Sequence, residues 1–207
     1  AGHGLPFDSE GMKERYPGVF FSQFTGAELV ADKWNLSRED LDKFALESHQ
    51  KAAHATESKY FDREILPVEG RNAEGMNDLV MADEGIRFDA SLDKLAGLNP
   101  VTEGGVITAG NASQITDGAA AVMVCNDAGL KKIQANPRAE IVSISVVGDD
   151  PVFMLTGPIP ASIQALKTAN LTIDDMDLYE VNEAFAPVPL AWAEDLKADR
   201  SKLNVNG

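Results

Sequence analysis

The chain contains a single cysteine, no long apolar run and few basic residues, and each of these shortages excludes a class of protein. Cys125 alone cannot form an internal disulfide, and no Cys or His residues have the spacing of metal ligands, so we expect no metal. The absence of both a run of about 18 apolar residues and a secretory signal predicts a cytoplasmic protein with no membrane partner. With 18 Lys and Arg against 33 Asp and Glu, the chain lacks the basic face that nucleic-acid binding requires.

The length of 207 residues and the hydrophobic content of 44% suffice for one large or two small domains. The chain begins at Ala1 without an initiator Met, and residues 203–207 alternate in the manner of a strand that has just begun. We therefore expect this sequence to be part of a longer protein, whose other residues contribute to function.

Helical signals begin after residues 1–21, which show no period and are predicted to form a loop. Thr25 and Glu28 have the spacing of a capping box and predict the start of one helix. Ser37 is predicted to cap a long amphipathic helix with Asp42 on its polar side. The core face of that helix is predicted to consist of Leu41, Phe44, Ala45, Ser48, Ala52 and Ala53.

Two histidines and one arginine in the first half are considered for binding, and we interpret the histidines as ordinary solvated or satisfied side chains. His49 and His54 are five residues apart in the long helix, so they lie on different faces, unlike a pair that shares a metal. Arg87 stands among acidic residues. It is either a surface ion-pair partner or a donor to a phosphate or adenine group, and the sequence alone favours the ion pair.

The region between the long helix and residue 95 has weak signals. Residues 65–68 form a short extended segment, and Pro67 indicates an edge or irregular strand. Residues 69–84 have no period and are predicted to be a loop, while a short helix is predicted around residues 91–95.

Two apolar runs in the second half predict buried strands. Small residues over 108–118 allow close backbone approach, and the aliphatic run that follows them, 119–124, predicts a strand that ends at Cys125. We interpret Cys125 as core filling. Asn126 is predicted to cap a short helix to Ile133, and the β-branched run 141–147 predicts a second strand.

The remaining elements complete the predicted α/β unit. A helix over 162–169, entered through Pro160, lies between the strand 141–147 and the short strand 178–181. Together with a helix that extends to Leu196, these elements predict a right-handed crossover unit of an α/β sheet. Since Pro187 and Pro189 fall where this last helix should begin, the helix either starts late or kinks.

Asn182 follows the strand 178–181 directly, at the carboxyl end where α/β sheets bind ligands. A side-chain amide in that position can direct a fixed dipole at a substrate oxygen. An isolated Asn before a helix also serves as an ordinary helix cap. The residues themselves leave both interpretations open.

Four stretches in sequence carry a resemblance to a known family. They are residues 108–118 with the following Ala run, 156–161, 181–186 and 204–207. In order and spacing they resemble the thiolase family, the coenzyme-A-dependent acyltransferases that make or cleave 3-ketoacyl thioesters. The helix after Ser37 and the segment 64–68 also resemble the lid of this family, so the likeness extends from about Phe24.

The resemblance implies a layered α/β/α/β/α core with an inserted, mainly helical loop domain that holds coenzyme A. It implies that residues 1–105 form this loop domain, and that 106–207 form part of the core, from the last strand of the first half to the start of the second. The intact protein would be a homodimer or homotetramer. The catalytic Cys would precede Ala1, and the catalytic His and second Cys would follow Gly207, so the 207-residue chain alone is expected to be inactive.

The resemblance also assigns site residues. Asn182 matches the asparagine that fixes a water in the thiolase oxyanion hole, whereas Cys125 matches neither family cysteine. Residues that contact coenzyme A or the acyl chain would be Ala109, Gly110 and Ser113 at the pantetheine, Arg87 and Ser91 near the nucleotide, and Met154, Ala184, Phe185 and Leu98 along the acyl tunnel.

One departure from the family bears on the substrate. Many short-chain thiolases have a His-Met pair where this chain has Ser22 and Gln23, which argues against a simple acetoacetyl substrate. The alternative to an enzyme is a non-catalytic relative that binds acyl-coenzyme A or lipid. Asn182 favours the enzyme, because members of the family with other specialities commonly have His there.

Overall fold

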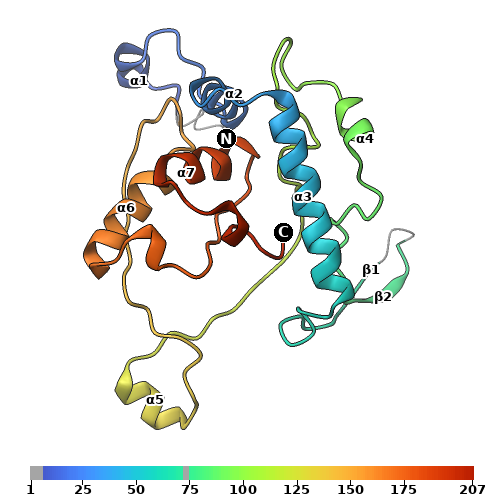
Figure 1. Cartoon of the computed structure of the whole chain (residues 1–207), viewed down its shortest axis with the longest axis vertical. Helices are drawn as coiled ribbons and strands as arrows, with labels where there is room; N and C mark the ends of the chain where they lie inside the picture. The colour runs from blue at the N-terminus through green and yellow to red at the C-terminus, as the bar shows by residue number, and fades with distance from the viewer. Residues whose placement is uncertain (1–6, 72–74) are drawn as a thin grey trace.

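The computed structural model describes residues 7–71 and 75–207, and most of its regular structure is helical. The elements in chain order are α1 (Glu10–Arg15), α2 (Gln23–Lys33), α3 (Arg38–Glu57), β1 (Val68–Arg71), β2 (Asn77–Val80), α4 (Leu92–Ala96), α5 (Asp127–Ile133), α6 (Pro158–Ala169), η1 (Ile173–Asp175), α7 (Pro187–Leu196) and η2 (Arg200–Lys202). Figure 1 shows α3 along one side, α2 and α7 beside its upper half, and α5 apart at the end of two extended segments. None of the helices described is long and apolar enough to cross a membrane.

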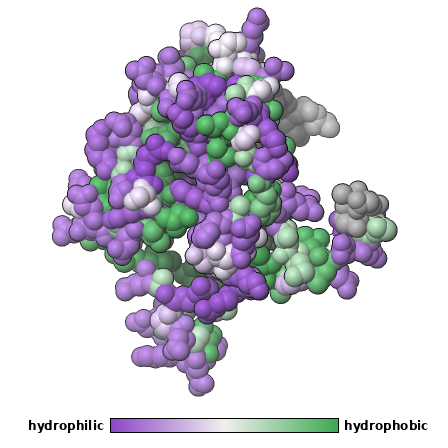
Figure 2. Space-filling view, turned by 45° about the vertical axis from the view of Figure 1, so that its right-hand side comes forward, coloured by the Kyte–Doolittle hydropathy of each residue, from purple (hydrophilic) through white to green (hydrophobic). Residues whose placement is uncertain are grey.

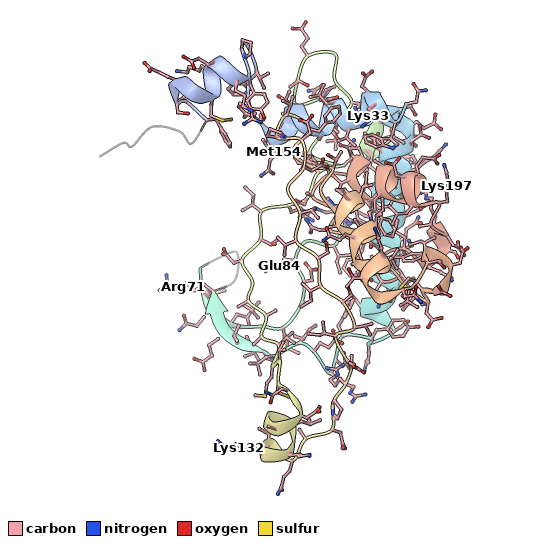
Figure 3. All side chains as sticks on the ribbon, turned by 90° about the vertical axis from the view of Figure 1, so that its left-hand side faces the viewer. Lys33, Arg71, Glu84, Lys132, Met154 and Lys197 are labelled. Carbon is pink, nitrogen blue, oxygen red and sulfur yellow. The ribbon has the colours of Figure 1, made fainter. Side chains whose placement is uncertain are left out.

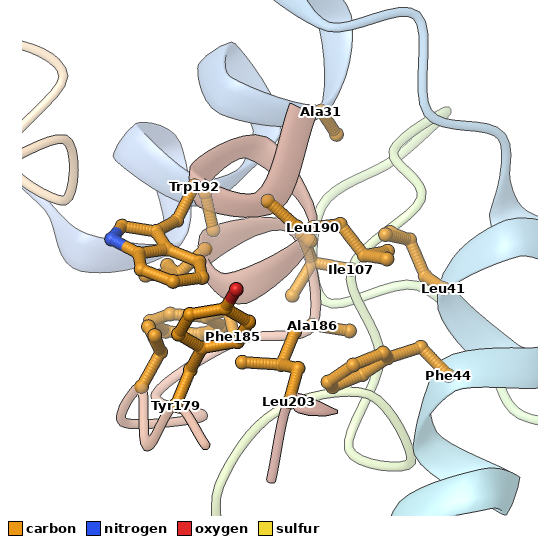
Figure 4. Packing of buried hydrophobic residues seen from close by; sticks show 14 of the residues in the cluster. Ala31, Leu41, Phe44, Ile107, Tyr179, Phe185, Ala186, Leu190, Trp192 and Leu203 are labelled. Atoms are coloured by element: carbon orange, nitrogen blue, oxygen red, sulfur yellow. The ribbon is translucent and has the colours of Figure 1, made fainter. Parts of the chain in front are cut away.

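The hydrophobic core lies around α7, between α2 and α3 (Figure 4). The first seven residues of α7, Pro187 to Ala193, are all buried, as expected of a helix that is apolar on every side and therefore central. The Trp192 ring packs edge-on against Tyr179, with 5.3 Å between the ring centroids, and its Nε1 donates to Ser162 Oγ at 2.9 Å. The hydrogen bond to Ser162 connects α7 to α6.

The segments 1–105 and 106–207, predicted as separate domains, share this core. Ala27, Leu41 and Phe44 from the first segment belong to the same cluster as Ile107 and Leu203 from the second. The division into a loop domain and a partial thiolase core remains a prediction.

The helix capped by Ser37 is confirmed as α3, which has 20 residues. Asp40 N–H donates to Ser37 Oγ at 3.2 Å and Ser37 N–H donates to Asp40 Oδ2 at 2.9 Å, so each residue satisfies a free amide of the other. Ser37 Oγ also donates to Asp40 Oδ2 at 2.6 Å, and this bond, followed by the one from Ser37 N–H, holds the pKa of the Asp40 carboxyl below its usual value. Three residues of the predicted core face are buried, namely Leu41, Phe44 and Ala45.

The placement of Asp42 on the polar side of α3 is wrong, because its side chain is buried with 3% of the residue exposed. Arg38 Nε donates to its Oδ2 at 2.8 Å, and Asn111 Nδ2 donates to its Oδ1 at 3.1 Å. Both partners compensate for the loss of water around the carboxylate. Sequence periodicity could not indicate this burial, because Asn111 is 69 residues away.

The start of α2 also differs from the prediction. The helix begins at Gln23, so Thr25 lies inside it, and Ser22 takes the cap position without a side-chain hydrogen bond. Glu28 accepts from Val106 N–H at 2.9 Å and from Ile107 N–H at 3.0 Å. The carboxylate therefore connects α2 to a distant turn and does not form a capping box.

Two regions predicted as loops contain regular structure. The segment 1–21 includes α1, whose cap Ser9 accepts from Met12 N–H at 3.3 Å. The loop prediction for residues 1–6 lies outside the described part of the chain. The segment 69–84 includes most of the antiparallel hairpin of β1 and β2, in which Val68 faces Val80. Since seven of the eight strand residues are exposed, the hairpin has no buried face and no alternating pattern to reveal it.

The buried strands predicted over 119–124 and 141–147 are wrong for this structure. Neither segment has regular structure, and Val122 and Ile144 are 88% and 74% exposed. Cys125 is exposed as well, so the interpretation of core filling is also wrong. A strand needs neighbours for its backbone hydrogen bonds, and among the described residues no segment pairs with either run.

The two unpaired segments run toward α5 and lie away from the packed helices (Figure 3). In the space-filling view, hydrophobic residues reach the surface in several places between polar ones (Figure 2). At the end of these segments α5 is confirmed, with Asn126 Oδ1 accepting from Gly129 N–H at 2.9 Å.

The predicted crossover of strand 141–147, helix 162–169 and strand 178–181 does not form, whereas the last helix of the predicted unit is present as α7. This helix begins at Pro187, so the late start is correct and both prolines lie in the first turn. The flanking segments form a parallel bridge between Tyr179 and Leu203. Tyr179 N–H donates to Lys202 O at 2.9 Å, and Asn204 N–H donates to Tyr179 O at 2.9 Å. The earlier strand of the predicted unit, 141–147, does not join them.

The ion pair of Asp42 generates a stability prediction. Asp42→Ala leaves the partly buried Arg38 guanidinium without its carboxylate and should lower the free energy of unfolding by about 3 kcal/mol. The matched control is Glu39→Ala, which removes another i,i+4 pair of the same helix; because that Lys43–Glu39 pair is exposed, its loss should cost under about 1 kcal/mol. Urea denaturation of the chain measures both, and equal losses would contradict the burial argument.

Candidate functional site

Asn182 lies on the surface beside the core. Its predecessor Val181 is buried with 8% of the residue exposed, whereas Asn182 itself is exposed. Within the described part of the chain, no protein group hydrogen-bonds its side-chain amide. The cap of α7 is Ala186, so the alternative that Asn182 caps this helix is wrong. The amide is therefore available to a ligand.

The segment after Asn182 pairs with the loop of small residues from 108 to 113. Ser113 N–H donates to Ala184 O at 2.9 Å, and Ala186 N–H donates to Asn111 O at 2.8 Å. Ala112 and Phe185 form an antiparallel bridge between these two bonds. The structure thus places Ser113, Ala184 and Phe185 next to each other, while their contact with a substrate stays a prediction.

Asn111 holds the loop in this position from inside the core, where only 3% of the residue is exposed. Its Oδ1 accepts from Thr108 N–H at 2.9 Å. Its Nδ2 donates to Asp42 Oδ1 and to Val106 O, both at 3.1 Å. The ion pair of α3 and the candidate site are therefore parts of one polar network, which the sequence analysis did not predict for either Asn111 or Asp42.

Gly110 allows the loop 108–113 to pack closely against α4 and Leu98. A Cβ at this position would lie 2.6 Å from both Leu95 Cδ2 and Leu98 Cδ1, so a side chain here would displace both leucines. Arg38 Nη2 donates to Leu98 O at 3.0 Å and fixes that leucine from the other side. Gly110 and Leu98 thus come together, while Ala109 is exposed at the surface.

The first turn of α2 lies between Phe185 and Met154. The Phe24 ring meets the Phe185 ring edge-on, with centroids 5.3 Å apart and an angle of 73°. A Cβ on Gly26 would lie 2.6 Å from Phe153 O and 3.5 Å from Met154 Cβ. Met154 has a φ of +63° and is seen beside α2 in Figure 3.

Arg87 and Ser91 occupy a second location. Arg87 N–H donates to His49 Nδ1 at 3.3 Å, and Arg87 Nη2 donates to Gln114 Oε1 at 3.3 Å. No carboxylate among the described residues pairs with Arg87, so the predicted surface ion pair is wrong. Ser91 caps α4, with Oγ accepting from Lys94 N–H at 3.3 Å. Gln114 joins this location to Ser113.

A hollow of about 220 Å³ lies beside Arg87 and is also lined by His49, His54 and Phe88. Although the two histidines are five residues apart, both border it. Burial, followed by the positive charge of Arg87, lowers the pKa of His49, while the negative charges of Glu183 and Asp83 act in the opposite sense. The described residues include no group of three or more Cys, His or acidic side chains that could hold a metal.

The comparisons with known proteins cover nearly the whole chain. Residues 10–128 match the family described as "Thiolase, N-terminal domain", and residues 135–207 match "Thiolase, C-terminal domain". The chain belongs to the thiolase family. It is 48% identical to a steroid 3-ketoacyl-CoA thiolase of Mycobacterium tuberculosis over 97% of this chain and 48% of that protein. It is 44% identical to the mitochondrial 3-ketoacyl-CoA thiolase of Rattus norvegicus over 87% of this chain and 46% of that protein.

Solved thiolases have the same fold. The human mitochondrial 3-ketoacyl-CoA thiolase superposes with a TM-score of 0.83 at 44% identity, over 88% of this chain and 46% of that one. The acetyl-CoA acetyltransferase of Bacillus anthracis superposes with a TM-score of 0.86 at 38% identity, over 92% and 48%. The predicted partial thiolase fold is confirmed, and the chain spans about half the length of the relatives that it matches.

Gly26 of this thiolase chain provides a test of the packing around Met154. Gly26→Ala should force the Phe153 carbonyl away and lower the free energy of unfolding by about 1 to 3 kcal/mol. Gly11→Ala in α1 is the control, since nothing lies within 4 Å of that Cβ position and Ala favours a helix by up to about 1 kcal/mol. Thermal unfolding compares the two, and a stabilising Gly26→Ala would contradict the close contact.

Proposed function

We propose that the protein containing this chain is a thiolase-type acyltransferase that condenses or thiolytically cleaves acyl-CoA and 3-ketoacyl-CoA thioesters. The observation that carries the proposal is the Asn182 side-chain amide, which is exposed and unbonded among the described residues, between two segments that the core holds in place. The names of the relatives support the same reaction class.

Asn182 would act on the thioester oxygen. When a nucleophile attacks a thioester, negative charge develops on that oxygen, and an amide N–H fixed nearby, directly or through a bound water, lowers the barrier. The amide does not need to reorganise, because Val181 is buried and residues 184–186 are bonded to the loop at 111–113. This residue would stabilise charge, while the nucleophile and the proton-transfer groups would be supplied by residues not assigned in this chain.

Coenzyme A would bind as a substrate beside Arg87 and Ser91 and along the small-residue loop at 108–113. Arg87, beside the hollow, offers guanidinium N–H groups to an anionic phosphate in a chain whose net charge is −15. Ala109 and Gly110 have no long side chains to obstruct a pantetheine arm. A relative of this chain, the human mitochondrial enzyme, has been solved in complex with CoA at 43% identity and a TM-score of 0.82.

The finer properties of the whole protein are parts of the proposal. It would be a homodimer or homotetramer, as the resemblance implies, and its location would be cytoplasmic, although several relatives are named as mitochondrial proteins. Phe24, whose ring contacts Phe185, directly follows Ser22 and Gln23, the two residues that replace the His-Met pair of many short-chain thiolases. This apolar neighbour supports acyl groups larger than acetoacetyl.

Replacement of Asn182 tests the assigned role. In the full-length protein, Asn182→Ala should reduce kcat for thiolysis by about 100-fold, with little change in KM, because the lost donor acts on charge that develops only in the transition state. Asn126→Ala, which removes the cap of the remote helix α5, is the control and should leave kcat unaltered. A normal rate for Asn182→Ala would remove the residue from the mechanism.

The chain by itself should be inactive. The 207 residues, purified and mixed with free CoA and a 3-ketoacyl-CoA longer than acetoacetyl-CoA, should give no thiolysis, whereas the full-length protein should turn this substrate over. Turnover by the short chain would place a nucleophile inside it, and Cys125→Ser would then be the first variant to assay. A full-length protein that binds CoA without any turnover would support the non-catalytic alternative instead.

A further inference from the structure

Asn204 lies directly behind the candidate site, in the segment that runs parallel to residues 179–181. It is buried, with 3% of the residue exposed, and its backbone has a φ of +44°, a conformation that Asn adopts more readily than most residues. Its N–H donates to Tyr179 O at 2.9 Å. The preceding residue, Leu203, is 1% exposed, and its carbonyl accepts from Lys51 Nζ of α3 at 3.1 Å.

The Asn204 side chain continues the pairing that its backbone begins. Its Oδ1 accepts from Val181 N–H at 2.9 Å, and its Nδ2 donates to Val181 O at 2.9 Å. The side-chain amide thus bonds both backbone groups of Val181, as a neighbouring peptide group would in a sheet. The second N–H of Nδ2 donates to Glu183 Oε1 at 2.7 Å. One oxygen and two N–H groups make up the hydrogen-bonding inventory of an asparagine side chain, and all three are used.

Asn204 therefore holds the residues on both sides of Asn182 and leaves Asn182 itself free. We infer that Asn204 is a positioning residue, which orients the Asn182 amide toward the thioester by fixing Val181 and Glu183. The inference rests on the proposed function and extends it to a residue that does not touch substrate. Lys51 of α3 bonds the carbonyl of the preceding residue, Leu203, so the segment that carries Asn204 is also bonded to α3.

The chemistry of the site requires an amide at position 204. An aspartate would keep an acceptor for Val181 N–H but would face Val181 O and the Glu183 carboxylate with no donor, which leaves buried acceptors unpaired. A glycine would permit the positive φ and lose all three side-chain bonds. These two changes alter different contacts, but both remove the bond to Val181 O. Both should therefore leave the Asn182 amide less firmly oriented.

The test measures kcat and KM for thiolysis in the full-length protein. Asn204→Asp and Asn204→Gly should each lower kcat by about 10-fold or more with KM changed less than about threefold, because substrate binding does not depend on the orientation of the amide. Asn170→Asp and Asn170→Gly are the matched controls, since Asn170 caps α6 with a φ of +55° and lies outside the site. They should leave both constants as in the parent protein.

Asn204→Asp and Asn204→Gly in the Asn182→Ala background distinguish a role in positioning Asn182 from a general effect on the stability of the site. If Asn204 acts through Asn182, its replacement should alter kcat by less than about twofold once the Asn182 amide is gone. An equal loss in both backgrounds would overturn the inference while leaving the proposed function intact. A normal kcat for Asn182→Ala, or no turnover by the parent protein, would overturn the proposed function and this inference with it.

Two further measurements guard against a general loss of structure. Glu183→Gln added to Asn204→Asp restores a donor opposite the new carboxylate and should recover part of kcat, whereas a merely destabilised protein would not respond. Hydrogen exchange of the Val181 amide in the 207-residue chain needs no activity, and it should accelerate in Asn204→Gly but not in Asn170→Gly. Unchanged exchange at Val181 would overturn the inference.

Discussion

The pairing of residues 111–113 with residues 184–186 is the contact on which the rest of this structure depends. Two backbone hydrogen bonds and one antiparallel bridge join segments more than 70 residues apart. This contact brings the small-residue loop to the start of α7, which packs between α2 and α3 at the centre of the core. The candidate substrate residues Ser113, Ala184 and Phe185 are members of the pairing itself, so fold and site depend on the same bonds.

The elements that the sequence revealed were those with local signals. Ser37 and Asn126 each accept from an amide three residues ahead in their own helix, so a few neighbouring residues in the sequence suffice to indicate the cap. The late start of α7 follows equally from the fixed geometry of its two prolines. These features need no information about distant parts of the chain.

The failures arose where a partner lies far away in sequence. Glu28 was predicted to be part of a capping box, but its carboxylate accepts from the amides of residues 106 and 107. Asp42 was predicted to lie on the polar side of its helix, but it is buried and accepts a hydrogen bond from Asn111. The runs 119–124 and 141–147 have strand composition, yet composition cannot supply the neighbours that complete a sheet. For the site, the resemblance to thiolases directed attention to Asn182, while Asn204 was noted only as part of a terminal motif, because its contacts with Val181 and Glu183 depend on the fold.

The network of Arg38, Asp42 and Asn111 has a consequence for how this chain selects its native arrangement. Apolar side chains tolerate small sliding movements, because one methyl group can replace another at little cost. A carboxylate bonded by one guanidinium and one amide does not, since a shift of the 108–113 loop by a single residue would remove the Asn111 amide and leave the buried Asp42 Oδ1 without a donor. Misregistered packings are thereby penalised, and the segments 108–113 and 184–186 assemble in one alignment only.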